Sequence, residues 1–309
     1  MEDLRTMSET SDPNAPRTGR QTRVLADGIH FGEGPRWHDG RLWFSDFHAH
    51  AVKSCSLASD CRIEFTIDDR PSGLGWMPDG SMLIVSMHNR QVLRRTADGT
   101  IAVHADLNDV AGWHCNDMVV DAKGRAYVGN FGFDMDRMIA EIGPEAMLAD
   151  HPRGKLAFVD TDGSVSVAAE DMDFSNGTVI TPDGRTLIIG ESLGGKLTAF
   201  DIADDGKLSN RRLWADIRPR HPDGNCLDAE GAIWIANPGA PECVRIAEGG
   251  RVLEVIDTGD PCYACMLGGE DGKSLFILTT AIWDDAERAV NATGRLLVAE
   301  VDVPHAGLP

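Results

Sequence analysis

Four residues with oxygen-bearing side chains occupy the same place in a pattern that recurs along the chain. They are Glu33, Asn116, Asn176 and Asp223, and each begins a strand-like segment that runs into a turn containing Gly. Carboxylates brought to one point repel each other unless a cation joins them. A set of oxygen ligands without His or Cys suits a hard cation. Ca²⁺ fits best, Mg²⁺ fits as well, and Mn²⁺ and Zn²⁺ are further alternatives. The alternative is that these residues only cap turns beside Gly.

The recurring pattern is a β-hairpin. Its copies read EGPRWHDGRLWFSD from Glu33, SGLGWMPDGSMLIVSM from Ser72, NDMVVDAKGRAYVGNF from Asn116, NGTVITPDGRTLIIGES from Asn176, DGNCLDAEGAIWIAN from Asp223 and, more loosely, ACMLGGEDGKSLFILTT from Ala264. Each copy places D-G, K-G or E-G between two apolar runs, which is a strong signal for a tight turn. The turn glycines recur about every 40 to 60 residues, the length of a four-stranded propeller blade.

Six copies predict an all-β, six-bladed β-propeller over residues 22–309 with a central metal site. Equivalent blade positions converge on the axis at one face, so the four oxygen-bearing residues should meet there. The strand-like runs at 23–29 and 294–301 should close the ring by sharing a blade. An open β-solenoid is the alternative, but the long and even turn spacing disfavours it. Residues 1–21 are polar and are expected to form a disordered arm.

The second strand of each hairpin should return to the metal face, so its last residues should wall a pocket. This reasoning selects Asp46, His48, His88, the run 130–133 with Phe131 and Phe133, Glu191, Ser192 and Asn237. A long gap between the third and fourth hairpins, residues 134–155, has loosely helical apolar spacing interrupted by Pro144. Because it leaves the same rim, it is predicted to cover the metal as a lid or specificity loop; a surface insertion without a role is the alternative.

Composition excludes several function classes. The formal net charge is −20, which argues against nucleic acid or an anionic membrane as partner, so a small molecule is expected. No apolar run is long enough for a membrane helix, and no secretory signal is recognisable, so a cytoplasmic monomer or dimer is expected. The seven cysteines are expected to be reduced thiols. Cys262 and Cys265 form a C-x-x-C pair, but no second pair supports a zinc or redox role.

Taken together, these motifs resemble the family of gluconolactonases, senescence marker protein (regucalcin) and luciferin-regenerating enzyme. The resemblance covers residues 22–302 and rests on EGPRW at Glu33, CNDMVVD around Asn116, S-N-G at 175–177, PDGNCLDAEGAIWIA from Pro222 and GGEDGKSLFILTT from Gly268. It implies that Glu33, Asn176 and Asp223 bind the metal. It also implies that Asn116 binds substrate and approaches the metal, and that Asp223 acts as acid or base.

One position departs from the family pattern. Sugar-lactone members usually carry Arg two residues before the N-D asparagine, where this chain has His114. An imidazole does not replace a guanidinium fork, so a less hydroxylated or more apolar lactone fits at least as well as an aldonolactone. His114, His48, His88, Phe131 and Phe133 are expected to contact the substrate, although a single His on such a rim is often only solvated.

The sequence therefore predicts a metal-dependent hydrolase that opens a lactone or related small ester. The cation would polarise the carbonyl, and Asp223 would serve as general base or nucleophile. Two alternatives remain, because propellers host many functions. One is another reaction on the same site, such as phosphotriester hydrolysis, isomerisation or hydration. The other is a propeller that binds calcium or a small ligand without catalysis.

Overall fold

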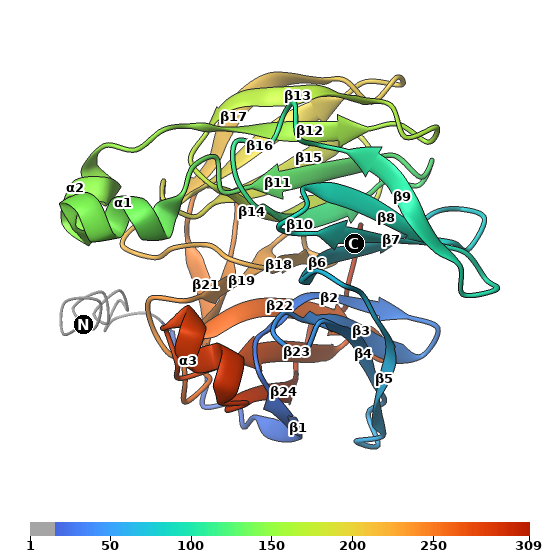
Figure 1. The fold of residues 1–309 in the computed structure, drawn as a ribbon. Helices are drawn as coiled ribbons and strands as arrows, with labels where there is room; N and C mark the ends of the chain where they lie inside the picture. Colours follow the sequence, from blue (N-terminus) through green and yellow to red (C-terminus); the bar gives the residue numbers. More distant parts are fainter. Residues whose placement is uncertain (1–15) are drawn as a thin grey trace.

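The computed structural model describes residues 16–309. These residues form six antiparallel sheets of four strands each, arranged around a central axis (Figure 1). The first strand of every hairpin lies innermost, and the six inner strands contact one another in a ring. The prediction of an all-β, six-bladed propeller is confirmed.

The first three blades follow the chain in order. They contain β2 (Gly32–His38), β3 (Arg41–Asp46), β4 (Ala51–Cys55) and β5 (Cys61–Thr66); β6 (Pro71–Trp76), β7 (Met82–Ser86), β8 (Gln91–Arg95) and β9 (Ile101–Asp106); and β10 (Cys115–Val120), β11 (Ala126–Asn130), β12 (Gly154–Val159) and β13 (Val165–Met172). Each tight turn between an inner strand and its neighbour contains a Gly in the left-handed region, as at Gly80 with φ 82°. A side chain at that φ would be strained, which explains the turn signal in the sequence.

The other three blades include the sixth, whose sheet combines strands from both ends of the chain. They contain β14 (Ser175–Ile180), β15 (Thr186–Glu191), β16 (Lys196–Ile202) and β17 (Leu208–Asp216); β18 (Asn225–Leu227), β19 (Ile233–Asn237), β20 (Glu242–Ile246) and β21 (Val252–Asp257); and β22 (Cys262–Gly268), β23 (Ser274–Thr279), β24 (Gly294–Glu300) and β1 (Arg23–Ile29). β1 pairs antiparallel with β24, with Arg23 opposite Val298. The predicted ring closure by a shared blade is therefore confirmed.

The core lies between the blades. Every residue of β7, β11, β19 and β23 is buried, because both faces of each sheet pack against neighbouring blades. One apolar cluster joins blades five and six through Trp234, Leu267 and Phe276. Close packing of this kind makes the strands rigid supports for the residues at their inner ends.

Three helices lie on one side of the propeller, as Figure 1 shows. α1 (Met135–Ile142) and α2 (Pro144–Ala149) form the predicted insertion, with Gly143 between them. α3 (Asp285–Val290) joins β23 to β24 and was not expected from the sequence. Within residues 16–309, none of the helices has the length and apolar character needed to cross a membrane.

The N-terminal segment is described only from residue 16, so most of the expected arm over residues 1–21 lies outside the described residues. The described end contacts the propeller. Val255 donates its backbone N–H to the Pro16 carbonyl at 2.9 Å, and Thr18 donates to Glu254 at 2.9 Å. Arg20 pairs with Glu254 and with Asp302 at 2.5 Å. These contacts hold residues 16–20 against blades five and six.

The expectation that all seven cysteines are reduced is wrong for one pair. Cys55 and Cys61 form a disulfide. The cause is local, because the two residues are direct partners in the β4–β5 ladder, with Cα atoms 4.1 Å apart. The other five cysteines are free and buried. Cys262 and Cys265 both belong to the apolar cluster between blades five and six.

Candidate active site

A repeated β-bulge positions the candidate ligands. The ladder of the inner strand is irregular between Glu33 and Arg36 in β2, Pro71 and Leu74 in β6, Cys115 and Met118 in β10, and Ser175 and Thr178 in β14. A bulge bends its strand and redirects a side chain, and it often occurs beside active sites. Glu33, Asn116 and Asn176 each lie in such a bulge. Asp223 lies immediately before β18.

The inner strands approach each other closely at this level. A Cβ atom added to Gly34 would come within 2.7 Å of the Ser72 carbonyl oxygen, and one added to Gly177 within 2.5 Å of the Asp223 carbonyl oxygen. Only Gly permits such contact between backbones. The candidate ligands are buried as a result, with exposed fractions of 5% for Glu33, 3% for Asn176 and 8% for Asp223.

Burial and neighbouring carboxylates raise the pKa values of two carboxyl groups at this point. Burial, followed by repulsion from the charges of Asp223 and Asp117, raises the pKa of Glu33 well above its ordinary value. Burial and then the charge of Asp117 raise the pKa of Asp223 to about 8. The Asn176 side chain and the Arg288 charge act in the opposite direction on Asp223. The structure thus brings Glu33, Asp223 and Asn176 together in a buried region where the repulsion between carboxylates outweighs the opposing charge of Arg288.

Two oxygens of this group have no partner. Asn176 Oδ1 and Asp223 Oδ1 are buried without a hydrogen bond, although buried polar atoms are nearly always bonded. Asn176 Nδ2 donates to Ser192 Oγ at 3.1 Å, which leaves its Oδ1 available as an acceptor. Asn116 Oδ1 accepts from Ser72 Oγ at 3.4 Å. Carboxylate and amide oxygens of this kind fit a hard cation. Among residues 16–309, no three His, Cys, Asp or Glu side chains are grouped so that they could hold a metal ion by themselves.

The axis also contains a buried ion pair that the sequence did not reveal. Arg36 Nη2 lies 2.8 Å from Asp117 Oδ1, and both side chains are about 5% exposed. Arg36 also donates to the carbonyl oxygens of Leu74 at 3.0 Å and Pro35 at 2.7 Å. The pair joins blades one and three. A sign was present in the sequence, since Asp117 stands where other copies have Gly, but its partner is distant along the chain.

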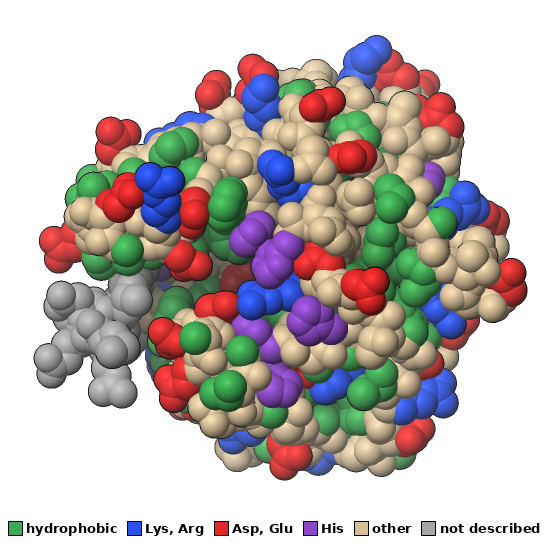
Figure 2. All heavy atoms as spheres, viewed as in Figure 1, with side chains coloured by type: hydrophobic (Ala, Val, Ile, Leu, Met, Phe, Trp, Pro, Cys, Tyr) green, Lys and Arg blue, Asp and Glu red, His purple; other side chains and the backbone are tan. Residues whose placement is uncertain are grey.

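An aromatic cluster lies on the side of the candidate ligands where the helices are found. Phe31, Phe47, Met87 and Tyr263 are buried together, with Phe131 packed against them. The ring centroids of Phe31 and Tyr263 are 4.8 Å apart. Phe131 also stacks on Phe174 at 4.3 Å. Figure 2 shows this face hollowed at its centre, with histidine side chains gathered around the hollow.

Two of the predicted substrate-binding histidines are in contact. The rings of His88 and His114 lie 4.3 Å apart, and His88 Nδ1 is 3.3 Å from Asp69 Oδ1. Asp69 is itself fixed by the Ser86 hydroxyl at 2.7 Å. Burial and then the charge of His88 lower the pKa of His114 to about 4. His114 is therefore a neutral hydrogen-bonding group at pH 7, unlike the Arg of the family pattern.

The third predicted histidine contacts helix α3. His48 is buried, and its Nε2 lies 3.2 Å from Asp285 Oδ1. The same carboxylate accepts two hydrogen bonds from Arg70, each at 3.0 Å. This three-residue contact, which we name the α3 clamp, fastens the helix over the edge of the hollow. It gives His48 a role in holding α3.

Four of the polar rim residues do not wall a pocket as predicted. Asp46, Asn130, Glu191 and Asn237 are almost fully buried at the ends of their strands. Asp46 accepts from the Phe31 N–H at 3.1 Å, and Glu191 accepts from the Asp173 N–H at 2.8 Å. Asn237 accepts from the Gly239 N–H at 3.1 Å. Each anchors a connecting loop, because a strand end leaves backbone groups that need partners.

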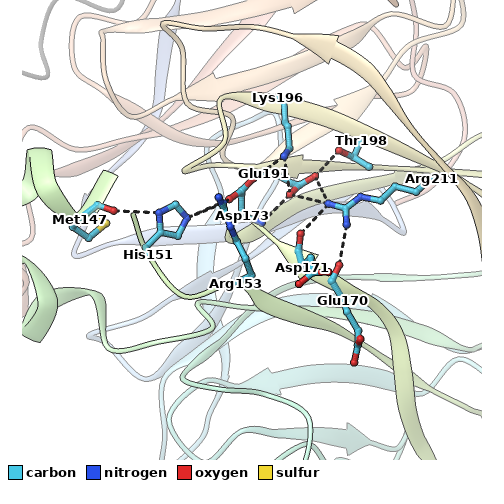
Figure 3. A network of polar contacts seen from close by, with 10 residues as sticks. All are labelled: Met147, His151, Arg153, Glu170, Asp171, Asp173, Glu191, Lys196, Thr198 and Arg211. Carbon is cyan, nitrogen blue, oxygen red and sulfur yellow. Dashed lines mark hydrogen bonds and ion pairs between the residues drawn. The ribbon is translucent and has the colours of Figure 1, made fainter. Parts of the chain in front are cut away.

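The insertion after β11 lies near α3 and is tied to the rim. The charges of Asp285 and Asp134, after burial, raise the pKa of Asp136 in α1, and Arg288 of α3 acts against this rise. Phe133 lies 5.7 Å from the His151 ring. Figure 3 shows His151 between the Met147 carbonyl, at 3.2 Å, and Asp173, at 3.3 Å. The expected lid thus begins at the hollow and ends on a polar network.

Fold and site together define a class: six-bladed propellers whose inner strands hold carboxylate and amide groups at the axis. Residues 31–281 match the family model described as SMP-30/Gluconolactonase/LRE-like region, and the chain belongs to this family. It is 28% identical to regucalcin of Sus scrofa over 261 residues, covering 82% of this chain and 84% of that protein. It is 26% identical to pentonolactonase XacC of Haloferax volcanii over 303 residues, covering 93% and 96%.

A solved structure agrees with this assignment at the level of the fold. The calcium-binding protein regucalcin from Agrobacterium tumefaciens superposes with a TM-score of 0.76 at 22% identity, covering 94% of this chain and 97% of that one.

Proposed function

We propose that this protein is a metal-dependent hydrolase that opens a lactone or a related small ester. The observation that carries the proposal is that Glu33, Asn176 and Asp223 lie together, with buried oxygens that no group of residues 16–309 satisfies. Relatives that span nearly the whole chain include a pentonolactonase, which supports the reaction class.

Glu33, Asn176 and Asp223 would hold the cation, with Asn116 close to it. Two carboxylates would balance a divalent charge, and an all-oxygen set favours Ca²⁺. The bound cation supplies Lewis-acid polarisation of the ester carbonyl. The need for such a partner follows from the raised pKa values of Glu33 and Asp223, since buried carboxyls at close range otherwise stay protonated.

The side chains of the protein carry out the proton transfer and the positioning of the ester. Asp223 takes the proton of the attacking water as general base, or attacks the carbonyl carbon as nucleophile. Its Oδ1 has no competing protein partner. Asn116 orients the ester, and neutral His114 donates or accepts one hydrogen bond beside it. The aromatic cluster around Phe31 and Phe131 excludes water and favours a ring with few hydroxyls.

The test is metal removal combined with a lactone panel. The protein is treated with EDTA, dialysed and assayed on sugar and alkyl γ- and δ-lactones by acid release, with and without added Ca²⁺, Mg²⁺, Mn²⁺ or Zn²⁺. Turnover that disappears with the metal and returns with it is the expected result. Full turnover in the metal-free protein would exclude this mechanism, and metal binding without turnover of any lactone would favour a binding propeller.

A further inference from the structure

Arg288 is a buried cation beside the candidate site. It lies on α3 with 9% of its surface exposed. Its guanidinium carbon is 4.0 Å from the centroid of the Phe31 ring and 4.9 Å from that of Tyr263. Nε donates to the Ile282 carbonyl at 2.6 Å, whereas Nη2 is buried without a hydrogen bond. No ion pair within residues 16–309 includes it.

The guanidinium acts on the candidate ligands. Its charge opposes the rise in pKa that burial produces in both Glu33 and Asp223, so all three groups share one electrostatic environment. The Phe31 ring beneath it belongs to the residue two positions before Glu33. Its charge also acts on the exposed Asp136 of α1, whose pKa it lowers. Arg288 is thus within electrostatic reach of both the candidate metal ligands and the insertion.

Arg288 forms no ion pair among residues 16–309, whereas two other arginines of this region do: Arg36 with Asp117 at 2.8 Å and Arg70 with Asp285 at 3.0 Å. Glu33 and Asp223 would be balanced by a divalent cation. A buried charge is costly unless an opposite charge pairs with it, and Nη2 of Arg288 is buried without a partner among these residues. A planar guanidinium with a free N–H edge matches a carboxylate.

The surroundings define the rest of the ligand. Phe31, Phe47, Met87, Tyr263 and Phe131 form an apolar wall next to the guanidinium. We propose that Arg288 binds a carboxylate of the substrate, which makes the substrates lactones that carry one carboxylate on an otherwise apolar ring. This inference rests on the proposed lactone hydrolysis and specifies its substrate class. In this proposal a guanidinium from α3 binds the substrate, whereas the family pattern has an Arg at the position of His114.

The test compares 5-oxotetrahydrofuran-2-carboxylate with the matching carboxamide, which has the same ring without the charge. Arg288→Met keeps the apolar part of the side chain over Phe31 and removes the guanidinium group. It is expected to lower kcat/KM for the carboxylate about 30-fold or more and to change that for the carboxamide less than about threefold. Arg288→Lys should recover part of the loss. Arg137→Met, on the exposed face of α1, controls for net charge. Equal losses on both lactones, or a wild-type preference for the carboxamide, would overturn the inference.

A binding measurement separates this inference from the hydrolysis itself. Calorimetry of the metal-loaded protein with 2-hydroxyglutarate and with 4-hydroxybutyrate compares ligands with and without the second carboxylate. The wild type should bind 2-hydroxyglutarate more tightly, and Arg288→Met should remove the difference. If the wild type opens no lactone, the proposed hydrolysis fails, yet this comparison still decides the role of Arg288. An unchanged difference in Arg288→Met would show that another group binds the carboxylate.

Discussion

At the scale of single residues, Glu33 and Asp223 differ from the other buried carboxylates of this protein. Asp117, Asp46 and Glu191 each accept from Arg, Lys or backbone N–H groups. Among residues 16–309, the one hydrogen bond that Glu33 accepts comes from its neighbour, the Gly34 N–H, at 3.3 Å. A carboxylate kept in this situation is expected to serve a bound ligand, because it does nothing for the stability of the empty fold.

Glu33→Gln should weaken metal binding. The amide keeps the size of the side chain and one oxygen but removes one of the two balancing charges, so the Kd for Ca²⁺ should rise at least about tenfold. Calorimetric titration of the EDTA-treated protein measures it. Glu141→Gln, on the exposed face of α1, is the matched control and should bind as the wild type does. Equal Kd values for Glu33→Gln and the wild type would remove Glu33 from the ligand set.

Asp223→Asn should abolish most of the turnover. The amide cannot accept a proton or attack a carbonyl, so kcat should fall by about 10²- to 10⁴-fold. Acid release from the best lactone of the panel measures the rate at saturating metal. Asp183→Asn, a charge-matched change in an exposed turn, should leave the rate within about twofold. A kcat for Asp223→Asn close to that of the wild type would show that the base or nucleophile is another group.

At the scale of elements, helix α3 depends on the α3 clamp for its position. His48, followed by Arg70, lowers the pKa of Asp285 well below its ordinary value despite partial burial. A lowered pKa means that the clamp contributes its full stabilisation above the pKa of an unfolded Asp, about 3.9, and loses it as the pH falls through the folded value. The Asp285 carboxylate should therefore stay ionised across the neutral range.

Asp285→Asn should loosen α3 at pH 7, where the wild-type carboxylate is ionised. The carboxylate is 52% exposed, so we expect a loss of only about 1 kcal/mol. Hydrogen exchange of the α3 amides measures it and should show faster exchange there, with no change in β23. Glu287→Gln, on the same helix outside the clamp, is the control. Unchanged exchange of the α3 amides in Asp285→Asn at pH 7 would contradict the role of this carboxylate in the clamp.

The elements also show where sequence reasoning works. Each hairpin was predictable because its signal is local: a turn glycine between two apolar runs, as at Gly80. The short helix α3 was missed, since it has only six residues, three of them charged, and its position depends on the distant Arg70 and His48. Glu191 was assigned to a pocket wall because its place in the strand was correct, whereas its direction is set by partners from other strands.

Glu191→Ala should destabilise the fourth blade strongly. Figure 3 shows that Glu191 joins Lys196, Thr198 and Arg211, and it is fully buried. Removing one partner of a buried ionic network costs about 3 to 5 kcal/mol. Urea unfolding followed by fluorescence measures the free energy of unfolding. Glu170→Ala, where the carboxylate is 64% exposed and 3.5 Å from Lys155, should cost about 0.5 kcal/mol or less. Similar losses for both variants would contradict this assignment.

At the scale of the whole molecule, the repeat explains why the site was partly predictable. Six similar hairpins around one axis bring residues at one register position together, whatever their distance along the chain. The register alone therefore selected Glu33, Asn116, Asn176 and Asp223, and the structure brings Glu33, Asn176 and Asp223 together. It did not reveal the Arg36–Asp117 pair or Arg288, because each of these breaks the repeat. Features that all blades share could be predicted from the sequence, whereas features of a single blade could be seen only in the structure.

Ring closure by β1 is the property that this fold needs as a whole. β1 completes the sixth blade, and its Leu25 and Ile29 are buried with 4% and 2% of their surfaces exposed. Deleting residues 1–29 exposes the edge of β24, and losing two buried side chains alone costs about 4 to 10 kcal/mol.

We expect the deleted protein to unfold at a much lower temperature and to lose Ca²⁺ binding, because blade six, which β1 completes, separates the blade of Glu33 from that of Asp223. Calorimetric melting with and without Ca²⁺ measures both effects. The control removes residues 303–309, whose backbone bonds to Gly272, Leu227 and Ile180 bridge blades six, five and four at the turn ends of the hairpins. That deletion should lower the melting temperature without affecting Ca²⁺ binding, since these contacts lie at the strand ends remote from the candidate ligands. A protein without residues 1–29 that still melts cooperatively near the wild-type temperature would show that five complete blades and three strands hold the site unaided.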